Sequence, residues 1–501
     1  MSSLLSQDKV LAVAAASVVA GVCFYWYEKK AQQTKDTVVR DPPHVWSWIP
    51  HVGSALAMGS DITEFIRSNG EKLLAPVFTA TIMGDKCVFV ADPQYLVTLA
   101  FRSNKYLDSL SLQKQFAKDV LACNELEVKE NFGREIDKIQ GQQYHHYLFK
   151  GAELENSLKQ AQELFQAMVP KLSSGAGWHD DLFDMVVRSI FKATMGPIFS
   201  HELVSDEMYE HFRVFDKGVI LLFSQAPQFL TKEARQARTA IRQQLETNEF
   251  WKQASGLMKA RKQAFEELSE AAFFKTSVGL LWASVGNTSP AVFWTLLLLL
   301  EHPKAWDACY AQVQAIVDRK KRNNDEDACL FTLEELDEMT LLQSAFQESL
   351  RLYQGNFTAR RVVQDFVLET PAQNYRIPAG TKLMAWWGVL HRDPDIFENA
   401  DEFQYDRFVD KSRKDFTFRD GKTLPHEPVI PFGGGEQYCP GRKFAAYEAK
   451  LFLAMMMQTF DMKLDRATYQ RPKIDPAMAG IGVSHPDSKV KVLIQPRNKN
   501  Q

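Results

Sequence analysis

The hydrophobic positions of this chain fall mostly at helical spacing, with a few short strand-like stretches between them. Residues 271–301 are apolar nearly all round, which predicts a central helix buried in the core. A second periodic run, Phe444 to Phe460, predicts another long helix near the C-terminus. Residues 76–99 instead predict two strands around a Gly84-Asp85 turn, followed by a helix. Further short strands are predicted at Arg360 to Val363, Tyr375 to Ile377 and Lys382 to Trp386.

The longest uncharged run lies near the N-terminus. Val10 to Tyr27 contains eighteen residues without a charge, so a helix there would span roughly 27 Å at about 1.5 Å per residue, just enough to cross a bilayer. Basic residues follow it, which favours a single-pass anchor at 10–27 with the bulk of the protein in the cytosol. A cleaved signal peptide is the alternative, which the bulky aromatic exit disfavours. Prolines then predict a stiff linker at 28–50 before a folded body at 51–501.

Composition and charge exclude several classes of protein. The net charge is −3 and there is no long block of like charge, so nothing suggests a nucleic-acid partner. The six cysteines lack C-x-x-C spacing, so they indicate neither a zinc site nor a disulfide framework. A reducing compartment fits best if one of them acts as a free thiolate.

The central helix contains the first candidate for chemistry. Pro290 has no N–H to donate to the carbonyl of Gly286, and its ring opens that turn. The freed carbonyl, together with Asn287 and Thr288, can hold oxygen and proton-carrying waters. A simple helix kink, with buried polar groups bonded back to the backbone, is the alternative interpretation.

The second candidate is the segment FGGGEQYCPGR, from Phe432 to Arg442. Its consecutive glycines let the backbone turn tightly and lie against a flat group. The helix that follows Cys439 directs its N–H groups toward the sulfur, which stabilises a thiolate. A thiolate held in this way is suited to a metal, and cysteine is the axial haem ligand that favours O–O cleavage. An inert buried cysteine in a glycine-rich turn is the alternative.

These motifs resemble those of the cytochrome P-450 superfamily. The spacing Phe432-x-x-Gly435-x-x-x-Cys439-x-Gly441 is similar to its haem-thiolate loop, although Gln437 replaces the basic residue common two places before the cysteine. The resemblance implies that Cys439 is the axial ligand of haem iron.

Three charged residues also match the superfamily by position. Glu348 and Arg351 lie three apart on one helix face, and as an exposed pair they would be worth only a few tenths of a kcal/mol. With Arg407 they resemble the buried Glu-Arg-Arg triad that braces the haem loop. Arg360 resembles the propionate-binding arginine. The usual Trp-x-x-x-Arg pair is missing, and Lys150 is its substitute by position.

The central helix resembles the distal helix of the same superfamily, with an altered acid-then-threonine pair. Gly286 takes the place of the acid and Asn287 that of the threonine; a shift by one residue would give Asn287 and Thr288 instead. The pattern Trp-Ala-Ser-x-Gly-Asn-Thr-x-Pro is similar to the subgroup that holds the sterol 7α- and 12α-hydroxylases and prostacyclin synthase.

The resemblance implies a mainly α fold with small β-sheets (α+β), in which haem b lies between the long central helix and the Cys439 loop. It implies a monooxygenase of the endoplasmic reticulum membrane that hydroxylates an apolar steroid or terpenoid with O₂. The electrons would come from an NADPH-cytochrome reductase. A reductase-independent isomerase of a lipid peroxide, like prostacyclin synthase, is the alternative, and a haem sensor without turnover is a third possibility.

Overall fold

The computed structural model describes residues 38–49, 52–100, 105–174, 177–265, 269–323, 330–434, 438–478, 480 and 482–497. The predicted anchor at 10–27, Gly435 and Gln437 lie outside the described residues.

Helices make up most of the described chain. They are α2 (Ala55–Ser60), α3 (Ile62–Leu73), α4 (Pro93–Ala100), α5 (Leu110–Asp119), α6 (Glu125–Asn131), α7 (Arg134–Leu148), α8 (Ala152–Ser174), α9 (Leu182–Ile198), α10 (Asp206–Phe223), α11 (Gln228–Leu245), α12 (Asn248–Lys252), α13 (Gly256–Ala264), α14 (Glu270–Gly286), α15 (Thr288–Glu301), α16 (Pro303–Arg322), α17 (Leu333–Glu338), α18 (Thr340–Tyr353), α19 (Gly388–His391) and α20 (Arg442–Thr459). The strands are β1 (Val39–Arg40), β2 (His44–Val45), β3 (Val77–Ile82), β4 (Asp85–Val90), β5 (Leu107–Asp108), β6 (Gly177–His179), β7 (Phe357–Val362), β8 (Phe366–Leu368), β9 (Asn374–Ile377), β10 (Lys382–Trp386), β11 (Phe460–Leu464) and β12 (Val492–Pro496).

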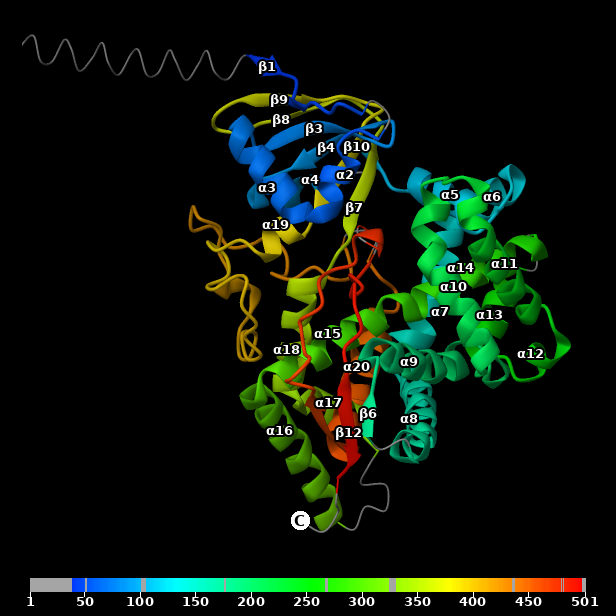
Figure 1. The fold of residues 1–501 in the computed structure, drawn as a ribbon. Coiled ribbons are helices and arrows are strands. Elements are labelled where there is room, and N and C mark those ends of the chain that lie inside the picture. The colour runs from blue at the N-terminus through cyan, green and yellow to red at the C-terminus, as the bar shows by residue number, and fades with distance from the viewer. Residues whose placement is uncertain are drawn as a thin grey trace, which may run out of the picture.

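The described strands form small sheets beside the helices (Figure 1). A 6-stranded sheet has the order β2-β3-β4-β10-β7-β5, and two 3-stranded sheets have the orders β1-β9-β8 and β11-β12-β6. β3 and β4 form the predicted hairpin, and β10 pairs in parallel with β4, so the sheet joins N-terminal strands to strands from late in the chain. The predicted mainly α fold with small β-sheets is confirmed.

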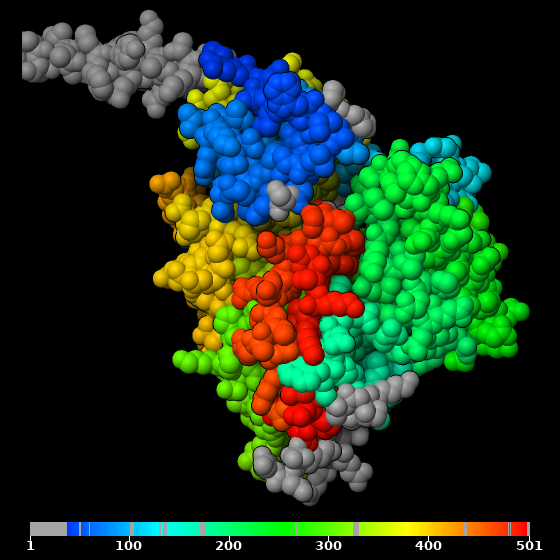
Figure 2. Space-filling view, viewed as in Figure 1, coloured from blue at the N-terminus to red at the C-terminus, as the bar shows by residue number. Residues whose placement is uncertain are grey.

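The helical core is built around α15, which contacts α9, α18 and α20. Thirteen of its residues, from Thr288 to Leu300, are buried, as the apolar pattern predicts for a central helix. The 6-stranded sheet packs on a second hydrophobic core. Figure 1 shows this sheet at one end of the molecule and the helices around α15 and α20 toward the other, while Figure 2 shows the red C-terminal residues along the middle of one face, beside green helices.

The folded body begins earlier than the predicted boundary at residue 51. β1 pairs with β9, and β2 pairs with β3, so described residues of the predicted linker belong to two sheets. Both β1 and β2 are edge strands of their sheets. Pro42 and Pro43, which lie between them, have no backbone N–H, but no hydrogen bond inside a sheet is lost because neither proline lies in a central strand. The Pro43 carbonyl still accepts from the N–H of Thr79 at 2.8 Å.

One helical run among the described residues, Glu270–Glu301, is long and apolar enough to cross a membrane. Its most apolar window is 83% buried inside the protein, so this run is the core helix pair α14–α15.

A buried carboxyl group between α20 and α9 makes the stability of this core depend on pH. Glu448 is 0% exposed, and its Oε1 accepts from the Thr194 hydroxyl at 2.6 Å. Burial raises the pKa of Glu448 to about 8, from 4.5. The folded protein therefore keeps a proton that the unfolded chain releases, and the contribution of Glu448 to stability falls as pH rises through this window.

Glu448→Gln should remove this pH dependence, because the amide is similar in shape and does not ionise. The free energy of unfolding of the variant relative to the unmodified protein should rise by as much as about 1.4 kcal/mol per pH unit between pH 5 and 8. Denaturant unfolding of both proteins at pH 6 and pH 8 measures this difference in the free energy of unfolding. Equal pH slopes for the two proteins would show that Glu448 ionises normally in the fold.

Candidate active site

The central helix is broken at Asn287, between α14 and α15. Pro290 lacks the N–H that would bond the Gly286 carbonyl inside a continuous helix. The Asn287 side chain reaches out of the helix instead, where its Oδ1 accepts from the backbone N–H of Val483 at 3.1 Å. Gly482 permits this contact because a Cβ there would collide with Asn287 Oδ1. The helix is thus interrupted by a tertiary contact as well as by proline.

Thr288 follows the break and keeps a local bond. Its hydroxyl donates to the carbonyl of Ser284 at 3.4 Å, which is the backbone bonding of the alternative interpretation. That bond is long for a hydroxyl donor, so the hydroxyl can turn to another acceptor at little cost. The Nδ2 amide of Asn287 has no hydrogen-bond partner within the described ranges.

The cysteine loop turns back on itself before α20. The N–H of Cys439 donates to the Phe432 carbonyl at 2.9 Å, which closes the loop, and Gly433 takes a φ of 71° that favours glycine. Burial raises the pKa of the Cys439 thiol, whereas the backbone N–H groups of Gly441 and Arg442 and the charge of Arg442 act to lower it. A bound cation would favour the thiolate form of this half-buried cysteine.

A cavity of about 590 Å³ lies between α14–α15 and the cysteine loop. It brings together most of the predicted site residues, which come from distant parts of the chain: Asn287, Thr288, Arg360, Phe432, Cys439 and Gly441. Residues of α7 and α14 extend the wall with mostly apolar side chains, among them Leu148, Leu280 and Ala283.

Arg360 is the cavity-facing cation of β7. Burial lowers the pKa of its guanidinium, and the charge of Asp108 raises it only in part. Its Nη1 donates to the neighbouring Ala359 carbonyl at 2.9 Å, and no carboxylate among the described residues forms an ion pair with it. A half-buried guanidinium of this kind has donors free for a carboxylate.

The residues around the cavity fit a haem group. Cys439 offers a soft sulfur donor, Arg360 offers a partner for a propionate, and Gly433 and Gly434 leave part of the wall free of side chains. These are the donor, the counter-charge and the flat surface that iron-protoporphyrin requires.

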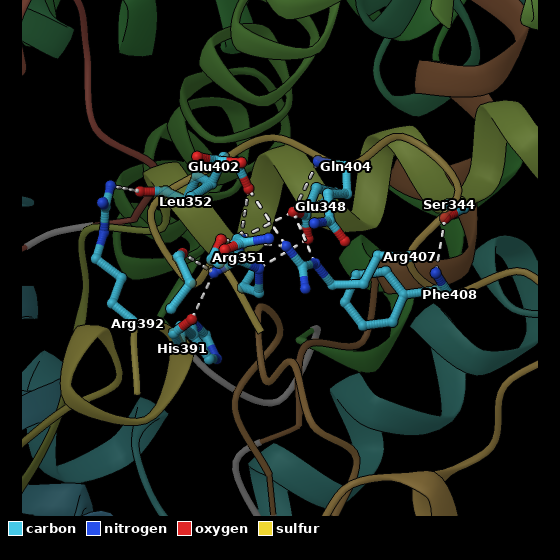
Figure 3. Close-up of polar contacts among 12 residues, drawn as sticks. Ser344, Glu348, Arg351, Leu352, His391, Arg392, Glu402, Gln404, Arg407 and Phe408 are labelled. Atoms are coloured by element: carbon cyan, nitrogen blue, oxygen red, sulfur yellow. Dashed lines mark hydrogen bonds and ion pairs between the residues drawn. The ribbon is translucent and has the colours of Figure 1, made fainter. Parts of the chain in front are cut away.

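The predicted triad is assembled in the core (Figure 3). The Glu348 carboxylate is 0% exposed and accepts two bonds from Arg351, at 2.7 and 2.8 Å, and a third from Arg407 Nε at 2.9 Å. The N–H of Gln404 donates to the same carboxylate at 3.1 Å. Arg351 also donates to the carbonyls of His391, at 2.7 Å, and of Ala400 and Glu402.

Hydrogen bonds connect the triad to the cysteine loop. His391, held by Arg351, accepts from the Ile430 N–H through Nε2 at 3.1 Å, and burial lowers the pKa of His391 to about 3, so the ring is neutral. Gln354 donates to the Ile430 carbonyl at 2.7 Å. Ile430 lies two residues before Phe432, so the triad fixes the segment from which the loop begins.

Two predicted site residues do not lie on the cavity. Lys150 is exposed between α7 and α8 and does not line the cavity, so its role as a propionate partner stays a prediction. Gly286 also lies off the wall, against Trp282 and Asp216. Its carbonyl lies near His485 and raises the pKa of that side chain, against the larger opposite effect of burial.

Arg261 of α13 is a cavity residue that sequence reasoning missed. It is 1% exposed, and its Nη1 donates to the Ser277 hydroxyl at 3.0 Å. Its neighbours Lys259 and Lys262 make α13 look like a basic surface helix, and no motif in the sequence distinguishes the buried arginine from them.

A cysteine loop, a cavity-facing arginine and a broken central helix around one cavity define a haem-thiolate oxidoreductase. The chain belongs to the cytochrome P450 family, whose model, described as "Cytochrome P450", matches residues 43–493. The predicted family and enzyme class are confirmed.

The relatives found lie in the predicted subgroup. The chain is 28% identical over 475 residues to a cholesterol 7-alpha-monooxygenase of Cricetulus griseus, covering 89% of this chain and 92% of the relative. It is 28% identical over 488 residues to a 7-alpha-hydroxycholest-4-en-3-one 12-alpha-hydroxylase of Oryctolagus cuniculus, covering 90% and 93%. The fold is similar to the solved structure of cyanobacterial CYP120A1 with bound retinoic acid, with a TM-score of 0.68 at 20% identity, covering 92% of this chain and 100% of that one.

Proposed function

We propose that this protein is a haem-dependent monooxygenase that hydroxylates a steroid or a terpenoid of similar shape. The observation that carries the proposal is the single cavity shared by Cys439, Arg360 and Asn287. The relatives named as sterol 7α- and 12α-hydroxylating enzymes support the steroid class.

The chain's own residues bind the cofactor and orient the substrate. Cys439 would hold the haem iron and Arg360 would bind a propionate, while the triad of Glu348, Arg351 and Arg407 would hold the loop in place. Bound haem supplies the dioxygen chemistry that amino-acid side chains lack. The apolar residues of α7 and α14 would bury the hydrocarbon skeleton of the substrate and exclude bulk water.

Asn287 and Thr288 are proposed to hold the water through which protons enter the cavity. The bond to Val483 fixes the Asn287 amide, so its Nδ2 keeps one direction. The Thr288 hydroxyl can both donate and accept once it leaves the Ser284 carbonyl. A water that bridges these two groups would have the two or more polar partners it needs.

Hydroxylation by O₂ consumes two electrons in each turnover, and the proposal assigns their supply to an NADPH-cytochrome reductase. Residues 10–27 would anchor the chain in the endoplasmic reticulum membrane, where that partner and an apolar substrate are both concentrated. The catalytic domain would face the cytosol.

The double variant Asn287→Leu with Thr288→Val should uncouple NADPH consumption from hydroxylation, because similar volume is kept while both polar groups are lost. With reductase, hydrogen peroxide should replace most of the hydroxylated product, and product formation should fall about 100-fold, in the range for general acid–base catalysis. The measurement is product and peroxide per NADPH with a panel of sterols, terpenoids and a prostaglandin endoperoxide.

Thr276→Val is the matched control. Thr276 lines the same cavity but its hydroxyl donates to the Phe273 carbonyl at 3.0 Å, three turns before the break, so this variant should remain coupled. Full turnover of any panel compound without reductase would overturn the monooxygenase proposal in favour of a lipid-peroxide isomerase.

A further inference from the structure

A buried carboxylate lies beside the break in the central helix. Asp216 of α10 is 2% exposed, and its Oδ1 lies 3.3 Å from the position that a Cβ on Gly286 would take. The same oxygen accepts from the indole N–H of Trp282 at 2.9 Å. In the first of the two alignments given above, Gly286 takes the place of the acid of the superfamily, and α10 places a carboxylate beside this residue without a side chain.

Two basic side chains, Arg213 and His485, lie near Asp216. Arg213 Nη1 lies 3.6 Å from Asp216 Oδ2, within the range of an ion pair but too far for a hydrogen bond. Burial lowers the pKa of His485, although the Asp216 charge and the Gly286 carbonyl oppose that shift. His485 thus lies near enough to both Asp216 and the Gly286 carbonyl to interact with them.

Asp216 does not line the cavity, but it contacts a residue that does. Trp282, which holds its Oδ1, lines the cavity, and so does Asn287, the residue after Gly286. On the other side, the Arg213 side chain is 13% exposed, although its Nη1 is buried. The Asp216 carboxylate thus lies close to the part of the cavity where Asn287 and Thr288 are proposed to hold water.

We propose that Asp216 is the proton donor of this enzyme, supplying from α10 the acid that the central helix lacks; this inference rests on the proposed monooxygenase function. The neutral acid gives its proton to a water at the break, next to the Asn287 amide and the Thr288 hydroxyl. The resulting carboxylate keeps its bond from Trp282 and its attraction to Arg213. It is protonated again from solvent past Arg213, so each proton that enters the cavity is replaced.

Asp216→Asn separates this role from a purely structural one. The amide keeps the volume of the side chain and an oxygen that can accept from Trp282, but it has no acidic proton to give. If Asp216 only clamps Trp282, the variant should behave like the unmodified protein.

The experiment measures product, peroxide and NADPH in the haem-loaded enzyme with reductase, in H₂O and D₂O. Asp216→Asn should lower product formation about 100-fold, raise peroxide per NADPH and enlarge the solvent isotope effect on product formation, with substrate binding unchanged. Adding Gly286→Asp, which returns a carboxylate to the same place from the helix itself, should restore coupling. Asp206→Asn, a change at an exposed carboxylate of the same helix, is the control and should leave coupling intact.

Normal coupling in Asp216→Asn would overturn the proposal, because it would show that Asp216 only clamps Trp282. Uncoupling that Gly286→Asp does not relieve would also overturn it, because a carboxylate at the same place should then replace the lost acid. Failure of the underlying function has a different signature. An unmodified enzyme that takes no electrons from the reductase would remove the need for any proton donor, whatever the variants did.

Discussion

Replacing Arg351 with alanine is expected to abolish stable haem incorporation and to lower the melting temperature sharply, although Arg351 does not line the cavity. Arg351 is 1% exposed and Glu348 0%. The substitution leaves a buried carboxylate that has lost two of its bonds, which costs about 3–5 kcal/mol. Since domains are stable by only about 5–15 kcal/mol, this is a large part of the total.

The same change also frees the carbonyls of His391 and Ala400 from their donor, and with them the segment that positions Ile430. The loss should therefore be visible as low haem content even where some protein folds. Haem content and thermal melting of the purified variant measure the two effects.

Arg319→Ala is the matched control for this prediction. Arg319 makes a similar two-bond contact with Glu338, at 2.7 and 2.9 Å, but the pair is 44% and 47% exposed. Water replaces the lost bonds there, so haem content and melting should change little. If the Arg351→Ala protein were as stable as the Arg319→Ala protein, the contact of Arg351 with Glu348 would be worth no more than an exposed ion pair, and the prediction would be wrong.

Elements with a strong local pattern could be predicted from the sequence. The apolar run at 271–301, the β3–β4 hairpin and the strands β7, β9 and β10 follow from periodicity and turn chemistry, which act within a few residues. The glycine-rich cysteine loop could be predicted for the same reason, because its residue types and spacing are local.

Features decided by distant segments could not be predicted. Pro290 indicates a kink, but the full break at Asn287 depends on Val483, which no local pattern connects to the helix. Likewise, the sequence shows only that Gly286 lacks a side chain; the carboxylate that faces it comes from α10.

Basic residues were the least predictable part of the site. Lys150 was selected from its position in the chain, but the structure places it between α7 and α8, where it is exposed. A lysine side chain is stable in water, so burial in the cavity would bring it no gain. Arg261, which has no motif, is buried by the packing of α13 against α7. Tertiary packing decides which basic side chains line a cavity, and the spacing of residues along the chain does not predict it.

Cys439→Ser should eliminate the thiolate signature of the haem-loaded protein. An alcohol oxygen is a harder and poorer donor to haem iron than a thiolate, so the carbon monoxide complex of the reduced protein should lack the red-shifted Soret band. Hydroxylation should be lost with it, because thiolate donation favours cleavage of the O–O bond. Difference spectra of the reduced protein with and without carbon monoxide measure the first effect.

Cys309→Ser separates loss of the ligand from loss of a buried thiol. Cys309 is 0% exposed on α16, and burial raises the pKa of its thiol to about 12, with no charged neighbour to oppose it. Cys439 differs because the Gly441 and Arg442 N–H groups and the Arg442 charge favour its thiolate, and because it faces the cavity. The serine variant at 309 should therefore keep the red-shifted band even if it melts earlier. If the red-shifted band survived in Cys439→Ser and disappeared in Cys309→Ser, the metal ligand would be Cys309, and the assignment of the cavity as the haem site would be wrong.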